Sequence, residues 1–88
     1  MVTREVTVVN ALGLHARAAA RFVRLASQYG STIRVSRGPR ELDGKSILGL
    51  LLLGAALGST ITIRADGEDA VAAVDALAAL VADKFGEA

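Results

Sequence analysis

The sequence predicts a two-layer α+β fold, with helices over one face of a mostly antiparallel β-sheet and the other face open to water. Four short segments alternate between apolar and polar positions or are rich in β-branched residues, which is typical of strands. Three others show apolar residues at helical intervals, or a short apolar run with capping residues at its ends. They follow in the order β-α-β-β-α-β-α without linkers or repeats, so we expect residues 1–88 to form one domain.

The first strand and the first helix are separated by a glycine-containing loop. Residues 2–9 alternate and are rich in valine, so they are expected to form the strand. After Gly13 the period changes, and a helix is expected from Ala16 until Gly30. Its buried face is expected to consist of Ala19, Phe22, Val23, Ala26 and Tyr29. The opposite face carries a basic stripe that consists of Arg17, Arg21 and Arg24, followed by Gln28.

A hairpin and a short helix are expected in the middle of the chain. Residues 31–36 and 40–43 are predicted to be strands, because a Gly-Pro turn separates them. Ser46 is a good N-cap for a helix over Ile47–Leu53, which Gly54 would end. The predicted helix therefore has about two turns.

The last strand and the last helix complete the pattern. Residues 60–65 alternate cleanly, and Gly67 turns the chain after them. Glu68 and Asp69 place negative charge at the start of an alanine-rich helix, and Lys84 suits its C-terminal end. The buried stripe of this helix is expected to consist of Val71, Val74, Leu77, Val81 and Phe85.

Composition excludes several classes of function. The chain has no cysteine and 1 histidine, which rules out disulfides, thiol nucleophiles and multi-histidine metal sites. Its net charge of +1 gives no overall attraction to nucleic acid or anionic lipid. The uncharged stretch from Ser46 to Ile63 approaches the length of a membrane helix, but glycines interrupt it, so no membrane insertion is expected. Arg4 and Glu5 stand where a secretory signal needs apolar residues, so a cytoplasmic protein is expected.

His15 is a candidate for phosphoryl chemistry because it lies where the loop meets the start of the first helix. Backbone N–H groups and the helix dipole favour an anion there and disfavour an imidazolium, which leaves one ring nitrogen free as a nucleophile. Arg17 follows two residues later and can pair with phosphate oxygens through its planar fork of donors. Position alone does not decide the function, because a single histidine at a helix N-terminus is more often a solvated or capping residue.

Two motifs carry more information than this position. The first is Gly13-Leu14-His15-Ala16-Arg17, followed by Ala19 and Phe22-Val23, and the second is Lys45-Ser46-Ile47-Leu48-Gly49 with Leu53-Gly54. With these motifs the chain resembles, over essentially its whole length, the histidine-containing phosphocarrier (HPr) family of the bacterial phosphoenolpyruvate-dependent phosphotransferase system. The resemblance implies an open-faced β-sandwich, in which three helices cover one face of a four-stranded antiparallel sheet.

The resemblance also implies roles for three residues. His15 would accept a phosphoryl group on its Nδ1 from phosphorylated Enzyme I and pass it to an Enzyme IIA-type domain. Arg17 matches the arginine that stabilises the phosphohistidine, and Ser46 matches the serine that a dedicated HPr kinase/phosphorylase modifies in many bacteria. The family's carrier is not an enzyme and needs no metal or organic cofactor, and we expect a monomer.

The short helix is also expected to contribute a docking surface. Residues 47–53 are apolar around the whole circumference, so some of them must face water in a domain this small. One interpretation is a helix buried under a loop, and the other, implied by the resemblance, is a surface that binds partners beside His15. That surface is assigned to Ala16, Arg21, Arg24, Ile47, Leu48 and Leu51. For the two arginines, a plain solvated face is the alternative.

One departure from the family pattern leaves the branch of the family open. Position 18 is alanine where the family usually has proline, and the first turn of a helix accepts either residue. A carrier for sugar transport and a carrier in a purely regulatory, nitrogen-type phosphorelay are therefore both consistent with the sequence. A small nucleic-acid-binding module is an alternative from another class, but an aromatic content of 3% offers no platform for base stacking.

Overall fold

The computed structural model describes residues 1–87 and contains a four-stranded antiparallel sheet with the strand order β1-β4-β2-β3. The strands are β1 (Val2–Thr7), β2 (Thr32–Arg37), β3 (Arg40–Asp43) and β4 (Thr60–Asp66). The strand β4 lies between β1 and β2, with Val6 opposite Ile61 and Val35 opposite Ile63. Apolar residues of three strands therefore meet on the same face of the sheet, as the alternation in the sequence predicted.

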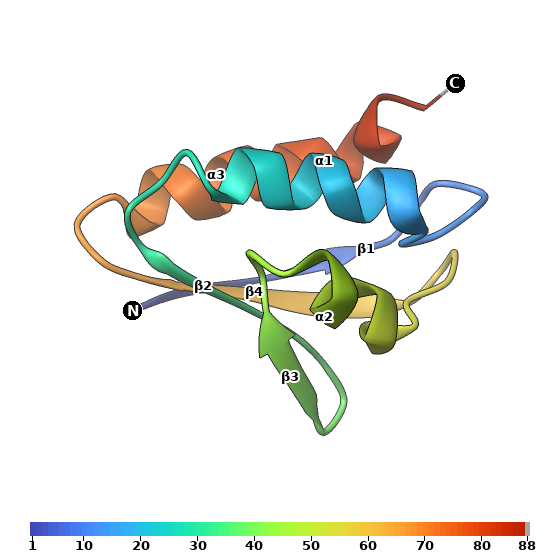
Figure 1. The fold of residues 1–88 in the computed structure, drawn as a ribbon, viewed down its shortest axis with the longest axis horizontal. Coiled ribbons are helices and arrows are strands. Elements are labelled where there is room, and N and C mark those ends of the chain that lie inside the picture. Colours follow the sequence, from blue (N-terminus) through green and yellow to red (C-terminus); the bar gives the residue numbers. More distant parts are fainter. Residues whose placement is uncertain (88) are drawn as a thin grey trace.

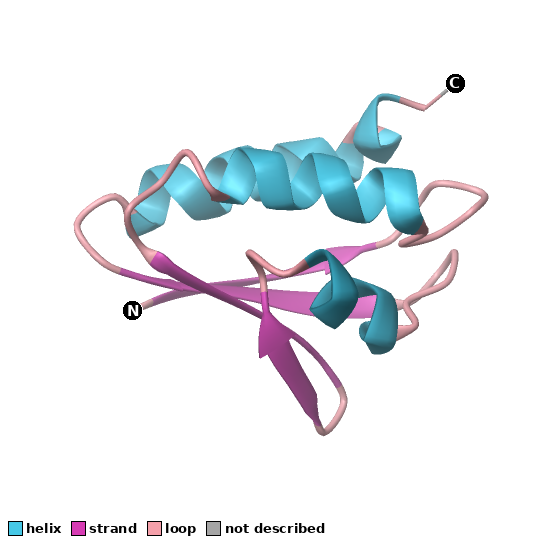
Figure 2. Cartoon of the chain, viewed as in Figure 1, coloured by secondary structure: helices cyan, strands magenta, loops and turns pink. Residues whose placement is uncertain are grey.

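Two long helices form one layer over this face, and a third helix lies beside them. The helices α1 (Ala16–Ala26) and α3 (Ala70–Ala82) run side by side over the strands (Figure 1). The short helix α2 (Ile47–Leu53) packs against α1 and β3. Figure 2 shows the long helices and the strands as separate layers. The predicted fold class, an open antiparallel sheet with three helices, is thus confirmed.

The core lies between the sheet and the helices, whereas the opposite face of the sheet is polar. The largest fully buried side chains are Val8, Phe22, Ile33, Val35, Leu50, Leu53, Ile61, Ile63, Val74, Leu77, Val81 and Phe85. On the open face, Glu41 pairs with Arg64 at 2.9 Å and with Arg34 at 3.6 Å. Among residues 1–87 no helix is long and apolar enough to cross a membrane.

Two elements end earlier than the sequence predicted. The strand β1 stops at Thr7 instead of Val9, although buried Val8 still bonds to the loop that precedes β4. The helix α1 stops at Ala26 instead of Gly30. In the next residues the hydrogen bonds span three residues instead of four, because the Gln28 N–H donates to the Leu25 carbonyl and the Tyr29 N–H donates to the Ala26 carbonyl. Apolar periodicity marks the face of an element better than its last residue.

The predicted buried stripe of α3 is wrong at Val71, whereas the predicted burial of Phe85 is confirmed, although this residue lies beyond the helix. Val71 is 61% exposed because Ala70, one residue earlier, takes the inward position in the first turn. Phe85 is fully buried but lies outside α3, in a 3₁₀ turn η1 (Lys84–Gly86). Lys84 and Phe85 both have left-handed backbone angles, with φ values of 56° and 55°. This turn changes the course of the chain after α3 and packs against α1, near the N-terminal end of that helix (Figure 1).

Candidate functional site

His15 is the N-cap of α1, and a tight loop holds it there. Its backbone is extended, with φ −79° and ψ 178°, and its carbonyl accepts the Ala19 N–H at 2.8 Å. The loop packs closely on the segment after α2, because a Cβ at Gly13 (φ +65°) would lie 2.7 Å from the Ala55 carbonyl oxygen. The Leu14 N–H donates to the same carbonyl at 2.9 Å. Glycine is therefore needed at position 13 to place His15 at the start of the helix.

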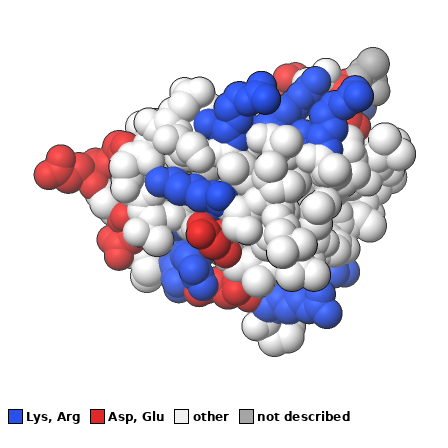
Figure 3. All heavy atoms as spheres, viewed as in Figure 1, with Lys and Arg blue, Asp and Glu red and all other residues white. Residues whose placement is uncertain are grey.

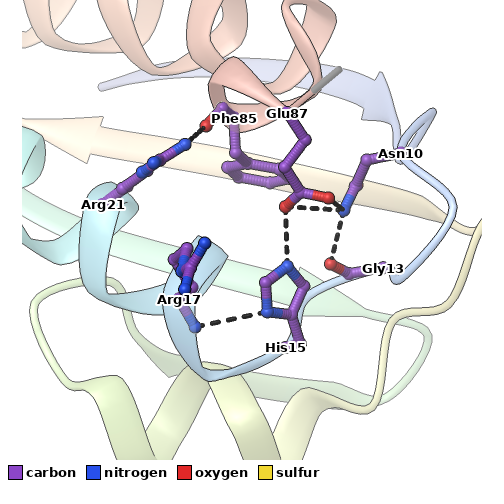
Figure 4. A network of polar contacts seen from close by, with 7 residues as sticks. All are labelled: Asn10, Gly13, His15, Arg17, Arg21, Phe85 and Glu87. Carbon is purple, nitrogen blue, oxygen red and sulfur yellow. Dashed lines mark hydrogen bonds and ion pairs between the residues drawn. The ribbon is translucent and has the colours of Figure 1, made fainter.

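The two ring nitrogens of His15 have different partners (Figure 4). On one side, the backbone N–H of Arg17 donates to Nδ1 at 3.3 Å. On the other, Nε2 lies 2.6 Å from Oε2 of Glu87. A backbone N–H can only donate and a carboxylate can only accept, so Nε2 carries the proton and Nδ1 keeps its lone pair. The site therefore presents Nδ1 as the unprotonated nitrogen of the ring.

Glu87 is held in place by Asn10, from the loop after β1. The Asn10 Nδ2 donates to the two carboxylate oxygens at 3.3 and 3.4 Å and to the Gly13 carbonyl at 2.7 Å. The hydrogen bond from His15 holds the pKa of Glu87 below its ordinary value. The Asn10 amide and the Arg21 charge lower this pKa further, while partial desolvation opposes them. Glu87 is thus kept ionised beside the imidazole ring.

The basic stripe of α1 borders a hollow at His15. This hollow has a volume of about 730 Å³ and is lined by Leu12, His15, Ala16, Arg17, Arg21, Gly86 and Glu87. Arg17 is exposed, whereas Arg21 is partly buried and donates through Nη1 to the Phe85 carbonyl. Arg24 is exposed and does not line the hollow. Figure 3 shows basic side chains gathered over α1, next to a wide uncharged area over α2. The hollow therefore presents an imidazole and two guanidinium groups, with the carboxylate of Glu87 on the Nε2 side of the ring.

Ser46 is the N-cap of α2, and its hydroxyl oxygen accepts the Gly49 N–H at 3.0 Å. The neighbouring Lys45 Nζ donates to the Tyr29 carbonyl at 2.7 Å, so the lysine is bound to the turn that follows α1 rather than extended from Ser46. The outward side of α2 exposes Ile47, Leu48 and Leu51 by 42%, 67% and 39%. Leu52 is 57% exposed as well, although the sequence did not single it out.

Two residues of the site were not found from the sequence. Asn10 and Glu87 show no motif, and 72 positions separate Glu87 from His15. Their contact depends on the turn at Lys84–Gly86, which an amphipathic pattern cannot predict. No group of three or more His, Asp or Glu side chains that could hold a metal ion is gathered within residues 1–87.

Comparison with known proteins assigns the chain to a family. The model of the family described as "PTS HPr component phosphorylation site" matches residues 2–83. The phosphocarrier protein HPr of Cupriavidus necator is 48% identical over 87 residues, which are 99% of this chain and 98% of the relative. The phosphocarrier protein NPr of Shewanella violacea is also 48% identical, over 97% of this chain and 93% of the relative.

Solved structures agree with these relatives. The crystal structure of HPr-C-His from Thermoanaerobacter tengcongensis superposes with a TM-score of 0.96 at 39% identity, over 100% of this chain and 99% of the other. An HPr dimer from the same organism has a TM-score of 0.79 at 41% identity, over 99% and 98%.

The fold and these matches define a small phosphocarrier protein of the phosphotransferase system. The chain belongs to the HPr family, to which both HPr and NPr phosphocarriers are related.

Proposed function

We propose that this protein carries a phosphoryl group on Nδ1 of His15, from phosphorylated Enzyme I to a histidine of an Enzyme IIA-type domain. The observation that supports this proposal most directly is the unprotonated Nδ1 at the N-terminus of α1, on a residue that lines a hollow with Arg17 and Arg21. The chain acts as a single cytoplasmic carrier domain and works as a monomer, without metal or organic cofactor.

The proposed transfer needs positioning and charge compensation more than covalent chemistry. The Nδ1 lone pair attacks phosphorus in line, and the bond from phosphorus to the donor histidine breaks. The guanidinium of Arg17 compensates the charge on the phosphoryl oxygens, and the first N–H groups of α1 face the same oxygens. The protein is a carrier and not an enzyme, because the group that it accepts leaves again with the partner.

The docking surface is proposed to consist of Ala16, Arg21, Arg24, Ile47, Leu48 and Leu51. Apolar side chains that α2 leaves exposed support it, together with the charge of α1 beside them. Ser46 lies at the edge of this surface, and we propose that an HPr kinase/phosphorylase modifies it. A phosphate at this N-cap would add negative charge where Enzyme I must approach.

The experiment that tests the proposal is incubation of the protein with Enzyme I and phosphoenolpyruvate, followed by intact mass measurement at neutral and acid pH. The expected result is the gain of one acid-labile phosphoryl group, which His15→Ala abolishes while circular dichroism shows an unchanged fold. Undiminished labelling of the alanine variant overturns the assignment. Glu68→Gln is the control, because Glu68 is exposed and lies outside both the hollow and the docking surface, so this variant should still be labelled.

A second candidate function is transfer within a regulatory, nitrogen-type phosphorelay. The 48% identity to the NPr of Shewanella violacea supports this possibility, and Ala18 is compatible with it. A side-by-side time course with a sugar-type and a nitrogen-type Enzyme I separates the two functions, because the cognate donor should phosphorylate His15 faster.

A further inference from the structure

We propose that Glu87 is a positioning residue for phosphoryl transfer: its carboxylate holds the proton on Nε2 of His15 and balances the positive charge that the ring acquires when Nδ1 takes up the group. This proposal rests on the proposed function of His15 as the phosphoryl carrier. It adds a residue from the far end of the chain to the machinery at the start of α1.

The contact between the two side chains is short and partly shielded from water. Oε2 of Glu87 lies 2.6 Å from Nε2, and the side chains are 20% and 28% exposed. An exposed ion pair on long side chains contributes little, because solvent screens it and both side chains lose conformational freedom. Here both side chains are partly buried, and Asn10 also holds the carboxylate. Solvent screening and the loss of conformational freedom are therefore smaller, so the contact can hold the ring in one orientation.

The C-terminal segment is built to bring Glu87 to this position. Buried Phe85 anchors the segment in the core, and its carbonyl accepts a hydrogen bond from Arg21 of α1. The left-handed angles of Lys84 and Phe85 turn the backbone sharply between α3 and Glu87. Non-glycine residues adopt this region rarely, so a pair of them in sequence persists only where the surrounding packing demands it.

Asn10 holds the carboxylate from the other side. This residue is 1% exposed, and its Nδ2 donates to both oxygens of Glu87 and to the Gly13 carbonyl. The same amide therefore connects the loop that carries His15 with the carboxylate that binds Nε2. The hydrogen bond from His15 is the largest cause of the lowered pKa of Glu87, so this carboxyl group is held in its ionised form.

The chemistry of the transfer gives this arrangement a function. When the Nδ1 lone pair forms the bond to phosphorus, the donor's N–P bond breaks and the ring becomes a cation that keeps its Nε2 proton. The charged groups that face the ring are Glu87, Arg17 and Arg21, and of these Glu87 is the anion. When the group leaves, the Nδ1–P electrons return to Nδ1 and the ring is neutral again. No proton is exchanged, because Glu87 holds the same proton throughout, as the carboxylate of a catalytic triad does for its histidine.

Two variants separate the two parts of the proposed role. Glu87→Ala removes both the acceptor for Nε2–H and the charge, whereas Glu87→Gln keeps an oxygen that can accept and removes the charge. Glu68→Gln is the matched control, because Glu68 is an exposed acid in the turn before α3. Nitrogen-15 NMR of the imidazole ring, at a pH where it is neutral, reports the tautomer without any phosphorylation. A time course with Enzyme I and phosphoenolpyruvate reports the transfer rate.

We expect the wild type and the Glu68→Gln variant to hold His15 in the Nε2–H tautomer, and Glu87→Ala to populate the Nδ1–H form. Glu87→Ala should lower the maximal rate of His15 phosphorylation by about tenfold, the effect of losing one charge-assisted hydrogen bond. Glu87→Gln keeps an acceptor but not the charge, so it should lower this rate by less, and KM for the carrier should stay unchanged in both variants. An unchanged tautomer in Glu87→Ala, or unchanged rates in both variants, overturns the proposal. If wild-type His15 is not phosphorylated at all, the proposed function fails first and this inference fails with it. If the wild type is phosphorylated and the Glu87 variants match it, the inference alone fails.

Discussion

The N-termini of α1 and α2 are capped in different ways. The cap of α1 is a residue that can react, whereas the cap of α2 mainly stabilises its helix. The α2 cap is Ser46, whose hydroxyl accepts the Gly49 N–H at 3.0 Å, as in an ordinary helix cap. The α1 cap is His15, whose Nδ1 accepts the Arg17 N–H at the longer distance of 3.3 Å. A nitrogen that is only weakly engaged as a cap can still attack phosphorus, and a well-satisfied serine oxygen contributes mainly to folding.

The two helices also differ in how much they depend on their caps. The 11-residue α1 is anchored by buried residues along its length, so it can keep a weak cap. The 7-residue α2 is held at both ends. Gly54 ends it in the left-handed conformation, and Arg40 and Arg37 donate to the carbonyls of Leu52 and Leu53. A reactive residue can therefore occupy a cap where burial already stabilises the helix.

The largest effect on the rate of phosphorylation is expected at the start of α1, beside the reactive His15. Arg17→Ala removes the guanidinium nearest to His15 in sequence and should lower the maximal rate of phosphorylation by Enzyme I by about a hundredfold, the usual scale for losing one donor to a developing charge. Arg24→Ala lies on the same face of α1 but outside the hollow, so it should raise KM and leave the maximal rate unchanged. Steady-state kinetics of both variants tests this, and equal losses in the maximal rate would contradict the assigned roles.

A smaller effect is expected from a charge placed at the α2 cap. Ser46→Asp keeps an oxygen that can cap the helix, so the thermal midpoint should stay nearly the same. The added charge beside Ile47, Leu48 and Leu51 should slow phosphorylation of His15 by about tenfold, a scale typical of one unfavourable charge at an interface. Ser46→Asn, an uncharged cap, is the control for a stopped time course. If the aspartate and asparagine variants react at the same rate, charge at position 46 does not regulate transfer.

The smallest effect is expected on stability, at the N-terminus of α3, which Asp69 precedes. Its carboxylate accepts hydrogen bonds from the Ser31 hydroxyl and from the backbone N–H groups of Gly30 and Ser31. The Ser31 hydroxyl is the largest cause of a pKa below the ordinary value of 3.8. The stability from this carboxylate is therefore present above pH 3.8 and is lost as the pH falls through the lower folded-state value.

Asp69→Asn should consequently unfold at lower temperature than the wild type at neutral pH, and the difference should shrink as the pH falls below 3.8. Thermal melts of both proteins across the acid range test this sign. A difference that grows toward low pH would show that the contact does not depend on the ionised carboxylate.

Local patterns were sufficient to predict the fold but not the whole site. Period-two and helical spacings identified the strands and helices, and the Ser46 and Gly54 signals located α2 correctly. The error at Val71 has another origin. In an alanine-rich helix several arcs are apolar enough to face the core, so docking against the sheet decides which of them is buried.

The surroundings of His15 depend on tertiary structure that no local pattern contains. His15 and Arg17 could be chosen because the motif Gly13–Arg17 resembles that of the HPr family and places both residues at one helix start. Glu87 reaches the ring through a reversal with two left-handed residues, and Asn10 reaches Glu87 from a loop without periodicity. The sequence therefore suggested a nucleophile, whereas its tautomer followed from contacts between the two ends of the chain.

The nitrogen that carries phosphorus is the most direct test of this account. Phosphorylation of ¹⁵N-labelled protein with Enzyme I and phosphoenolpyruvate, followed by two-dimensional ¹H–¹⁵N correlation of the ring, distinguishes Nδ1 from Nε2. The account predicts phosphorus on Nδ1 of His15, with a proton retained on Nε2 at neutral pH. Phosphorus on Nε2, or on a residue other than His15, would contradict it.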